Sequence, residues 1–297
     1  MNSSSNSSLN STWIPDGVVS GRLISSIIMG LCCVLGLPGN IGVLVVILRR
    51  SSRRLNFTLC LMLNLASSDI LCLATVPVWI YHILHAWILC CAACKLATFL
   101  LYLSLCCNML TVTLFGVHRY LQVLYPQMLN RLGPCLLLAL WGLACALTAL
   151  AVATRDVVDG ELKCQRHTGS DAERVAVLVL ETLLGFVIPF SVLVTSYCRL
   201  HRRVNQTALF SSAKMTWLVT SVVVTFFTLW IPVHIVNMVD ITCIVQQTSL
   251  PESSVALRCH RNTAARVARC FLFFNCCLDP FLYAFASRRI REQPKSS

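Results

Sequence analysis

The sequence places two carboxylates and two carboxamides inside long apolar stretches. Asp69, Asn108, Asn275 and Asp279 each lie well within such a stretch, far from the polar segments that separate them. A carboxylate removed from water needs a nearby positive charge, or else it takes up a proton. Polar groups in this setting are functional candidates, and these four predict either a charged core site or a protonated, hydrogen-bonded cluster.

Arginines in the outer parts of the apolar stretches form a second candidate site. Arg155 lies 14 residues beyond Trp141, which is about 21 Å if both belong to one helix. Arg174 and Glu181 are seven residues apart, so they share one helix face. An arginine that faces a cavity prefers a carboxylate or a phosphate, which predicts an anionic ligand. The alternative is that Arg155, Arg174 and Arg266 extend their charged groups to the membrane surface.

Helical periodicity places further polar residues on the inner faces of two stretches. Trp230, His234 and Asn237 share one face, and we expect His234 and Asn237, together with Glu181, to recognise ligand hydroxyl groups. Arg269 shares its face with a stripe of residues expected to point inward, so it is a fourth basic candidate. The stripe continues as Cys276, Asp279 and Tyr283.

The elements that must position these groups are membrane-spanning helices. The chain of 297 residues is 57% hydrophobic and 12% charged, whereas soluble domains average about 25% charged residues. A spanning helix needs about 20 apolar residues, and seven windows meet that length. The windows are 22–48, 57–85, 92–124, 132–154, 174–200, 212–244 and 263–286. We therefore predict an all-α, seven-helix domain over 22–286, an outer tail over 1–21 and a short cytosolic tail over 287–297.

The orientation of the chain follows from its glycosylation sequons and its charge. Sequons at Asn2, Asn6 and Asn10 predict a glycosylated N-terminus outside the cell. Seven spans then place the C-terminus in the cytosol, where 14 of the 24 Lys and Arg residues would lie with one acid, Glu292. This distribution follows the positive-inside rule, and it suits anionic lipids or an acidic cytosolic partner. No basic stripe is interleaved with exposed aromatics, which argues against nucleic-acid binding.

A set of motifs in a fixed order identifies the class that the chain resembles. Along residues 30–290 it is similar to the rhodopsin-like G-protein-coupled receptors. The motifs are Gly36–Asn40 (GLPGN), Asn64–Asp69 (NLASSD), Asn108, His118–Tyr120 (HRY), Trp141, Pro189, Tyr197, Phe226, Trp230–Pro232 (WIP), Asn275 and Asp279–Tyr283 (DPFLY). The resemblance implies a receptor of the plasma membrane that signals to a heterotrimeric G protein.

The resemblance also implies an outer disulfide and a core ion. The disulfide would join Cys94 to Cys164, while Cys243 and Cys259 flank the third outer loop and could form a second one. A sodium ion would be held by Asp69, with Asn108 and Asp279 nearby, and would favour the inactive state. A protonated cluster without an ion is the alternative.

Signalling residues are carried over from the same class. The resemblance implies that Arg119 moves toward the G protein, that Tyr197 and Tyr283 receive it, and that Trp230 and Pro232 form a hinge. The chain departs from the class at His118, because an acid usually precedes this arginine and pairs with it in the resting state. We therefore expect raised basal signalling, unless other contacts hold the resting state. Tyr120 and Phe226 complete this group of residues.

The choice of ligand class starts from two negative observations. Outer helix 3 contains Thr98 and Tyr102 but no acid, which argues against an amine ligand, and helix 7 contains no Lys, which argues against a visual pigment. The segments Glu181–Phe190 and Trp230–Asn237 resemble helices 5 and 6 of the leukotriene B4 receptors.

That second resemblance implies a site for a lipid mediator. Arg155, Arg174 and Glu181 match the residues that line it in the family, and Thr98 stands near a histidine of the family. Coupling to inhibitory G proteins and a role in chemotaxis are also implied. The alternative within the class is a receptor for a chemoattractant peptide, whose C-terminal carboxylate the arginines would bind.

Other membrane-protein functions fit the sequence less well. Residues 22–154 and 174–286 do not repeat one another, as the halves of many transporters do. No HExxH or Gly-x-Ser-x-Gly motif and no paired catalytic carboxylates are present, so we predict that the chain is not an enzyme. No cofactor is expected beyond the sodium ion.

Overall fold

The computed structural model describes the chain over 16–50, 56–85, 90–124, 126–153, 155–158, 163–166, 169–204, 213–246 and 255–291. Some side chains within these ranges are not described, including those of Arg119, Arg155 and Arg166. The predicted sequons at Asn2, Asn6 and Asn10 lie outside the described residues, so glycosylation stays a prediction.

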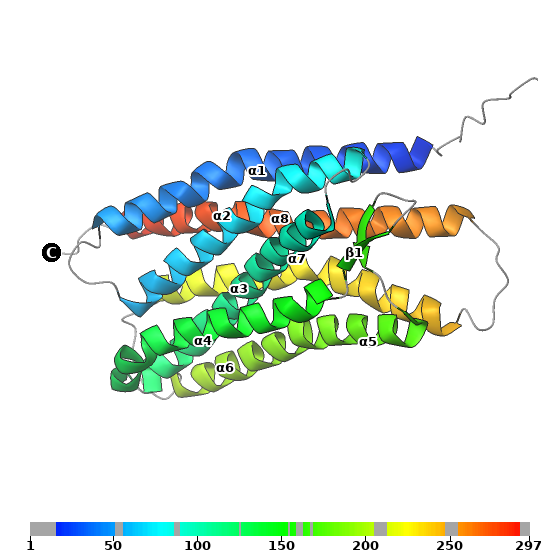
Figure 1. Ribbon diagram of the computed structural model, residues 1–297. Coiled ribbons are helices and arrows are strands. Elements are labelled where there is room, and N and C mark those ends of the chain that lie inside the picture. Colours follow the sequence, from blue (N-terminus) through cyan, green and yellow to red (C-terminus); the bar gives the residue numbers. More distant parts are fainter. Residues whose placement is uncertain are drawn as a thin grey trace, which may run out of the picture.

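In the described ranges, eight α-helices and one short π-helix form the seven membrane spans (Figure 1). The elements are α1 (Asp16–Arg50), α2 (Phe57–Leu84), α3 (Cys91–Leu124), α4 (Pro126–Ala153), β1 (Arg155–Val158), β2 (Lys163–Arg166), α5 (Asp171–Thr182), η1 (Leu183–Val187), α6 (Ile188–Val204), α7 (Ala213–Gln246) and α8 (Val255–Arg291). The predicted all-α, seven-helix fold is confirmed. Most helices extend beyond their apolar windows, because a helix continues past the hydrocarbon layer into the polar interface.

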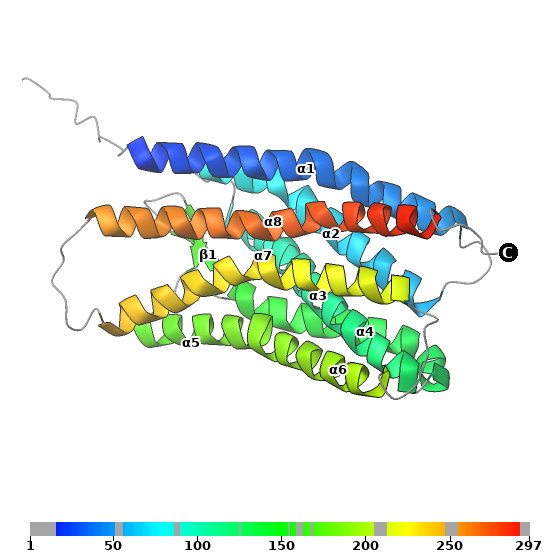
Figure 2. The ribbon, with the colours of Figure 1, turned by 180° about the vertical axis from the view of Figure 1, so that it is seen from behind.

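Among the described residues, six helical segments are long and apolar enough to cross a membrane. The seventh span, α8, has only residues 263–283 with described side chains, and these include Arg266, Arg269 and Asp279. Because of these charged residues, α8 is not among the six apolar segments. Figures 1 and 2 show α8 packed along α1 and beside α7, which places it firmly within the bundle.

The outer surface of the bundle is apolar at mid-height. Val34 on α1 and Leu138 on α4 are 71% and 75% exposed, although each would be costly to leave in water. Large exposed aliphatic residues spread over several helices are expected where lipid replaces water as the solvent. The exposure pattern thus agrees with a protein that crosses the membrane repeatedly.

The fifth span is continuous but changes its winding halfway. It starts at a capping box, in which the Ser170 side chain accepts a hydrogen bond from the Glu173 N–H at 3.2 Å, and the Glu173 carboxylate accepts one from the Gly169 N–H at 2.8 Å. The π-helical turn η1 then precedes Pro189. Proline has no N–H and its ring displaces the preceding turn, which explains why the winding widens there.

The two largest of the buried clusters among the described residues pack around the polar core. The first lies between α2, α3, α6 and α7 and centres on Leu65, Phe115, Leu193 and Phe226. The second joins α1, α2 and α8 and is rich in cysteine, including Cys32 and Cys276. These clusters surround the polar core residues, so the polar groups are enclosed in apolar packing.

Candidate functional site

The four core polar residues are all buried, and two of them are hydrogen-bonded to each other. Asp69 is fully buried, and Asn108, Asn275 and Asp279 are each 1% exposed. The Asn108 Nδ2 donates to Asp69 Oδ1 at 2.9 Å, and the Ser68 hydroxyl donates to Asn108 Oδ1. These two hydrogen bonds join α2 to α3, and Asn275 and Asp279 belong to α8.

Several oxygens of this core cluster have no hydrogen-bond donor among the described residues. They are Asp69 Oδ2, both carboxylate oxygens of Asp279 and Asn275 Oδ1. Buried acceptors without donors are costly, and hard cations prefer oxygen ligands of this kind. The donor set therefore fits a sodium ion. No group of three His, Cys, Asp or Glu side chains suited to a metal occurs in the described part of the chain.

Two further polar contacts fix the helices around the core cluster. Asn40 Nδ2 donates to the carbonyls of Gly36 at 3.0 Å and Cys276 at 2.8 Å, which ties α1 to α8. Asn64 accepts from Trp141 Nε1 at 2.9 Å and donates to Thr111 at 2.6 Å. The motifs that contain Asn40, Asn64 and Trp141 can be found in the sequence, but these hydrogen bonds depend on tertiary contacts.

An aromatic column on α7 lies above the core cluster. Trp230 stacks on Phe226 and on His234, with ring centroids 4.9 Å and 6.0 Å apart. His234 also contacts Phe186 of the π-helical turn at 4.9 Å. It is 7% exposed, and neither ring nitrogen has a hydrogen-bond partner among the described residues. His234 therefore offers an unused donor and acceptor directly above Trp230.

The remaining candidate ligand residues differ in exposure. Arg174 is exposed on α5, and Glu181, two turns along the same helix, is half-buried. Asn237 is half-buried on α7, one turn beyond His234. Arg269 is exposed, although Ala265 and Phe273, four residues to either side on α8, are buried. Arg269 is thus an exposed cation between buried residues of α8, and the inward direction of its side chain stays a prediction.

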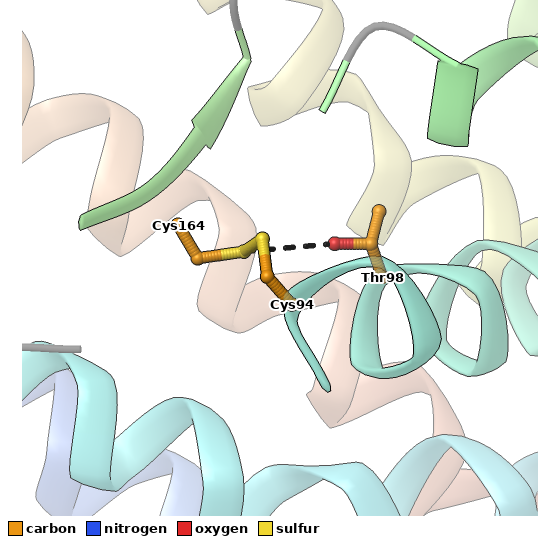
Figure 3. The surroundings of a disulfide bond; sticks show 3 residues. All are labelled: Cys94, Thr98 and Cys164. Atoms are coloured by element: carbon orange, nitrogen blue, oxygen red, sulfur yellow. Dashed lines mark hydrogen bonds between the residues drawn. A yellow bond between two sulfur atoms is a disulfide. The ribbon is translucent and has the colours of Figure 1, made fainter. Parts of the chain in front are cut away.

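The predicted disulfide Cys94–Cys164 is present (Figure 3). It joins the outer end of α3 to β2 of the hairpin, and both cysteines are buried. Thr98 is fully buried, with its hydroxyl 3.9 Å from Cys164 Sγ, so it packs against the disulfide. Tyr102, one turn further into the bundle, is half-buried. Cys243 is a free thiol, and the side chain of Cys259 lies outside the described residues.

The predicted position of Arg155 on the fourth helix is wrong. The helix α4 ends at Ala153, and Arg155 is the first residue of β1. The two strands pair antiparallel, with Val157 opposite Cys164. The chain leaves the helix here because β2 must return to α3 to form the disulfide, a constraint that local sequence does not reveal.

Comparison with known proteins now decides the family. Residues 39–283 match the 7 transmembrane receptor (rhodopsin family). The chain belongs to the rhodopsin family of seven-transmembrane receptors. It is a multi-pass membrane receptor rather than an enzyme, and membership implies an extracellular ligand and coupling to a G protein.

Relatives within the rhodopsin family include several chemoattractant receptors. The C-X-C chemokine receptor type 3 of Capra hircus is 31% identical over 92% of this chain and 75% of its own length. The C5a anaphylatoxin chemotactic receptor 1 of Cavia porcellus is 29% identical over 93% and 83%. The leukotriene B4 receptor 1 of Homo sapiens is 28% identical over 91% and 78%. The chain is thus a rhodopsin-family receptor of the chemoattractant group.

On the cytosolic side, the receptor places an aromatic contact where the class usually has an acid. His118 is 3% exposed, and its ring lies 5.1 Å from that of Phe57 at the start of α2. Thr220 on α7 donates to the Tyr197 hydroxyl at 3.3 Å. The Tyr283 hydroxyl is buried and has no partner among the described residues. Tyr120 is half-buried, and the Arg119 side chain is not described.

Replacing His118 with aspartate is expected to lower agonist-free signalling by about twofold or more. Aspartate would supply the anion that pairs with the neighbouring arginine in the resting state of the class, which His118 cannot do. Agonist-free binding of a non-hydrolysable GTP analogue to membranes, normalised to receptor number, measures the effect. The variant His118→Asn is the control for size, since it has no charge. Equal basal binding in the aspartate variant and the unmodified receptor would show that other contacts hold the resting state.

Proposed function

We propose that this receptor detects a chemoattractant ligand through a carboxylate, and that the ligand is a peptide or small protein whose C-terminus enters the outer end of the bundle. The observation that carries the proposal is the exposure of Arg269 in the middle of an otherwise buried stripe of α8. With the exposed Arg174 across the bundle on α5, this arginine offers a carboxylate two cationic partners. Relatives named for chemokines and for the C5a anaphylatoxin favour a peptide ligand.

A hydroxylated fatty acid is the second candidate, and one specific observation favours it. His234 is buried beside Trp230, neither of its ring nitrogens has a partner in the part of the chain that the structure describes, and Asn237 follows one turn later. These groups suit ligand hydroxyls deep in an apolar site. The segment Trp230–Asn237 of α7, which resembles helix 6 of the leukotriene B4 receptors, contains these residues, and a relative named for leukotriene B4 is 28% identical. A chemoattractant peptide and a hydroxylated fatty acid both carry a carboxylate, so Arg174 and Arg269 can bind either kind of ligand.

Signalling is proposed to pass down α7 to an inhibitory G protein. A ligand that reaches His234 would press on the stacked column of Trp230 and Phe226. Pro232, inside the same helix, removes a backbone hydrogen bond and makes a change in bend less costly. The core cluster, proposed to hold sodium in the resting state, lies on the path from this column to the cytosolic end.

The test compares each ligand with a form whose carboxylate is blocked. Cells expressing the receptor are exposed to C5a anaphylatoxin, to its C-terminal amide, to leukotriene B4 and to its methyl ester, and inhibition of cyclic AMP is measured. One free acid is expected to signal, and its blocked form should be at least about tenfold less potent, because a charge-assisted hydrogen bond contributes roughly 1.5–3 kcal/mol.

Two variants test whether Arg269 of α8 binds the ligand carboxylate. Arg269→Ala should reduce the potency of the free acid toward that of the blocked form. Arg22→Ala, which removes a cation from the outer part of α1, should leave the potency unchanged. If free and blocked forms are equally potent, or if neither ligand class signals, the proposed function is incorrect.

A further inference from the structure

The outer end of α3 contains three cysteines close together in the sequence. Cys90 directly precedes the helix, and Cys91 is its first residue. Cys94 is bonded to Cys164 of β2, whereas Cys90 and Cys91 carry thiols, of which the first is exposed and the second half-buried. Cys91 and Cys94 are therefore spaced as Cys-x-x-Cys, with two alanines between them. Cysteines at this spacing can share a disulfide and exchange it with a third cysteine.

The position of Cys91 brings it within reach of the disulfide. Residues three apart on a helix have Cα atoms about 5 Å apart, and disulfides join Cα atoms about 4.4–6.8 Å apart. The N–H groups of the first turn have no partners within the helix, so the first residue can shift more easily than a residue in the interior. A bond between Cys91 and Cys94 therefore needs rotation of the side chains and a small shift of the first turn, and not unwinding of α3.

The charges at this end of α3 favour the attacking form of Cys91. A thiolate, and not a thiol, attacks a disulfide, and negative charge is favoured at the N-terminus of a helix. Lys95 follows Cys91 by four residues, so the two occupy neighbouring positions on one face of the helix. Residues 91–98 contain no acid. The outer turns of α3 thus place positive and no negative charge beside Cys91.

The sulfur of Cys164 has a hydroxyl group beside it on the other side of Cys94. Thr98 is fully buried one turn further into the bundle, and its hydroxyl lies 3.9 Å from Cys164 Sγ (Figure 3). Cys91, Cys94 and Thr98 are spaced by three and four residues, so they form one row along α3. Displacement at sulfur needs the attacking and leaving atoms on opposite sides of the sulfur under attack. The order of the three residues along the row suits this requirement.

We propose that Cys91 and Cys94 form a thiol–disulfide exchange site that releases the outer hairpin from α3. The Cys91 thiolate attacks Cys94 Sγ, so that a Cys91–Cys94 bond forms as the Cys94–Cys164 bond breaks. The electron pair of the broken bond leaves on Cys164 Sγ, which then takes a proton from water, as Cys91 gave one up. The Thr98 hydroxyl donates to the departing thiolate. The number of disulfides is unchanged, so the exchange needs no oxidant or reductant.

The exchange would change how the hairpin is held. The present bond joins residues 70 positions apart in the chain, whereas a Cys91–Cys94 bond closes a single turn of α3. The strand β1 would still pack against α3, but β2 would have no covalent attachment to it. The receptor would thus have two disulfide forms of the same composition that differ in the freedom of the outer hairpin. This inference goes beyond the proposed function, since it does not depend on the ligand.

Mapping the disulfides of the full-length receptor tests the exchange site. Receptor in lipid nanodiscs is held in mildly alkaline buffer without added thiol, and acid then stops the exchange. After unfolding in acid, thiols are blocked with N-ethylmaleimide, and peptic peptides are identified by mass spectrometry without reduction. A fraction of the unmodified receptor should contain a Cys91–Cys94 disulfide together with a blocked Cys164.

Two serine variants identify the attacking cysteine. Cys91→Ser should contain at least about tenfold less blocked Cys164 than the unmodified receptor, because it lacks the thiol that acts at a high effective concentration. Cys90→Ser is the matched control, since it removes the neighbouring thiol that precedes the helix, and it should behave as the unmodified receptor does.

Three outcomes of the mapping would overturn the exchange site. The first is an unmodified receptor in which every Cys164 is bonded to Cys94. The second is equal release of Cys164 in Cys91→Ser and in the unmodified receptor. The third is a loss of the exchange in Cys90→Ser alone. No ligand is used, so each of these results leaves the proposed function untouched, and failure of the ligand panel leaves the exchange site untouched.

Discussion

Valine in place of Gly36 is expected to lower the amount of receptor at the cell surface at least about fivefold. A Cβ atom added at Gly36 would lie 2.6 Å from Leu73 Cδ1 and 3.2 Å from the Cα of Cys277. The leucine side chain can move, but the second contact is with the backbone of α8. Forcing extra carbons into such a site costs about 1–3 kcal/mol or more, because helices must separate. The hydrogen bond from Asn40 to the Cys276 carbonyl of α8 would be stretched at the same time.

Gly42 provides a matched control within the same helix. An added Cβ at this position meets nothing within 4 Å, so Gly42→Val introduces the same β-branched residue into α1 without a clash. Surface labelling of an N-terminal epitope, divided by total receptor, measures both variants. Similar losses at the two positions would mean that the helix tolerates valine poorly in general, and that the close approach of α1 to α8 is not the cause.

The fold could be predicted from the sequence because each segment that spans the lipid must be a long apolar helix, whose backbone hydrogen bonds are all internal. The seven apolar windows predicted the number of spans, and the uneven distribution of arginines predicted their orientation. The ends of the helices were less predictable, since they lie where lipid gives way to water. The capping box at Ser170, four residues before the predicted start of the fifth span, was a local signal that could have placed that end.

The candidate site was predictable where helical periodicity alone places a residue. Asp69 and Asn108 meet because each is the polar group on the inner face of its helix. Arg155 was misplaced because its position depends on a disulfide between segments that are far apart in the chain. The direct pairing of Arg155 with Arg166 depends on strand register, which neither helical periodicity nor composition contains. The register of the hairpin is therefore the part of this site that required the structure.

The core cluster and its neighbours connect α8 to three other helices. Asn108 Nδ2 lies 3.5 Å from Cys276 Sγ as well as 2.9 Å from Asp69, and the carbonyl of Cys276 accepts from Asn40. A shift of α8 would change contacts with α1, α2 and α3 at once. An ion between Asp69 and Asp279 would offset the repulsion of two buried carboxylates and hold α8 against α2.

Sodium is expected to stabilise the unmodified receptor and to have no such effect on the variant Asp69→Asn. Binding to the folded state alone stabilises by about 2.7 kcal/mol when the ion is present at about 100 times its dissociation constant. Asparagine removes the charge but keeps an oxygen that can accept from Asn108, so the hydrogen bond between α2 and α3 is retained. Without the charge of Asp69, the carboxylate of Asp279 and the side-chain oxygen of Asn275 should bind sodium only weakly.

The measurement is the melting temperature of receptor in lipid nanodiscs as sodium chloride replaces N-methylglucamine chloride at constant ionic strength. The control variant is Asp171→Asn, which neutralises an exposed carboxylate in the first turn of α5. It should respond to sodium as the unmodified receptor does. A saturable sodium response that is lost only with Asp69 supports the ion, because non-specific effects of salt would act on all three proteins. An unmodified receptor whose melting temperature does not change with sodium would instead indicate that Asp69 and Asp279 are kept neutral by protons.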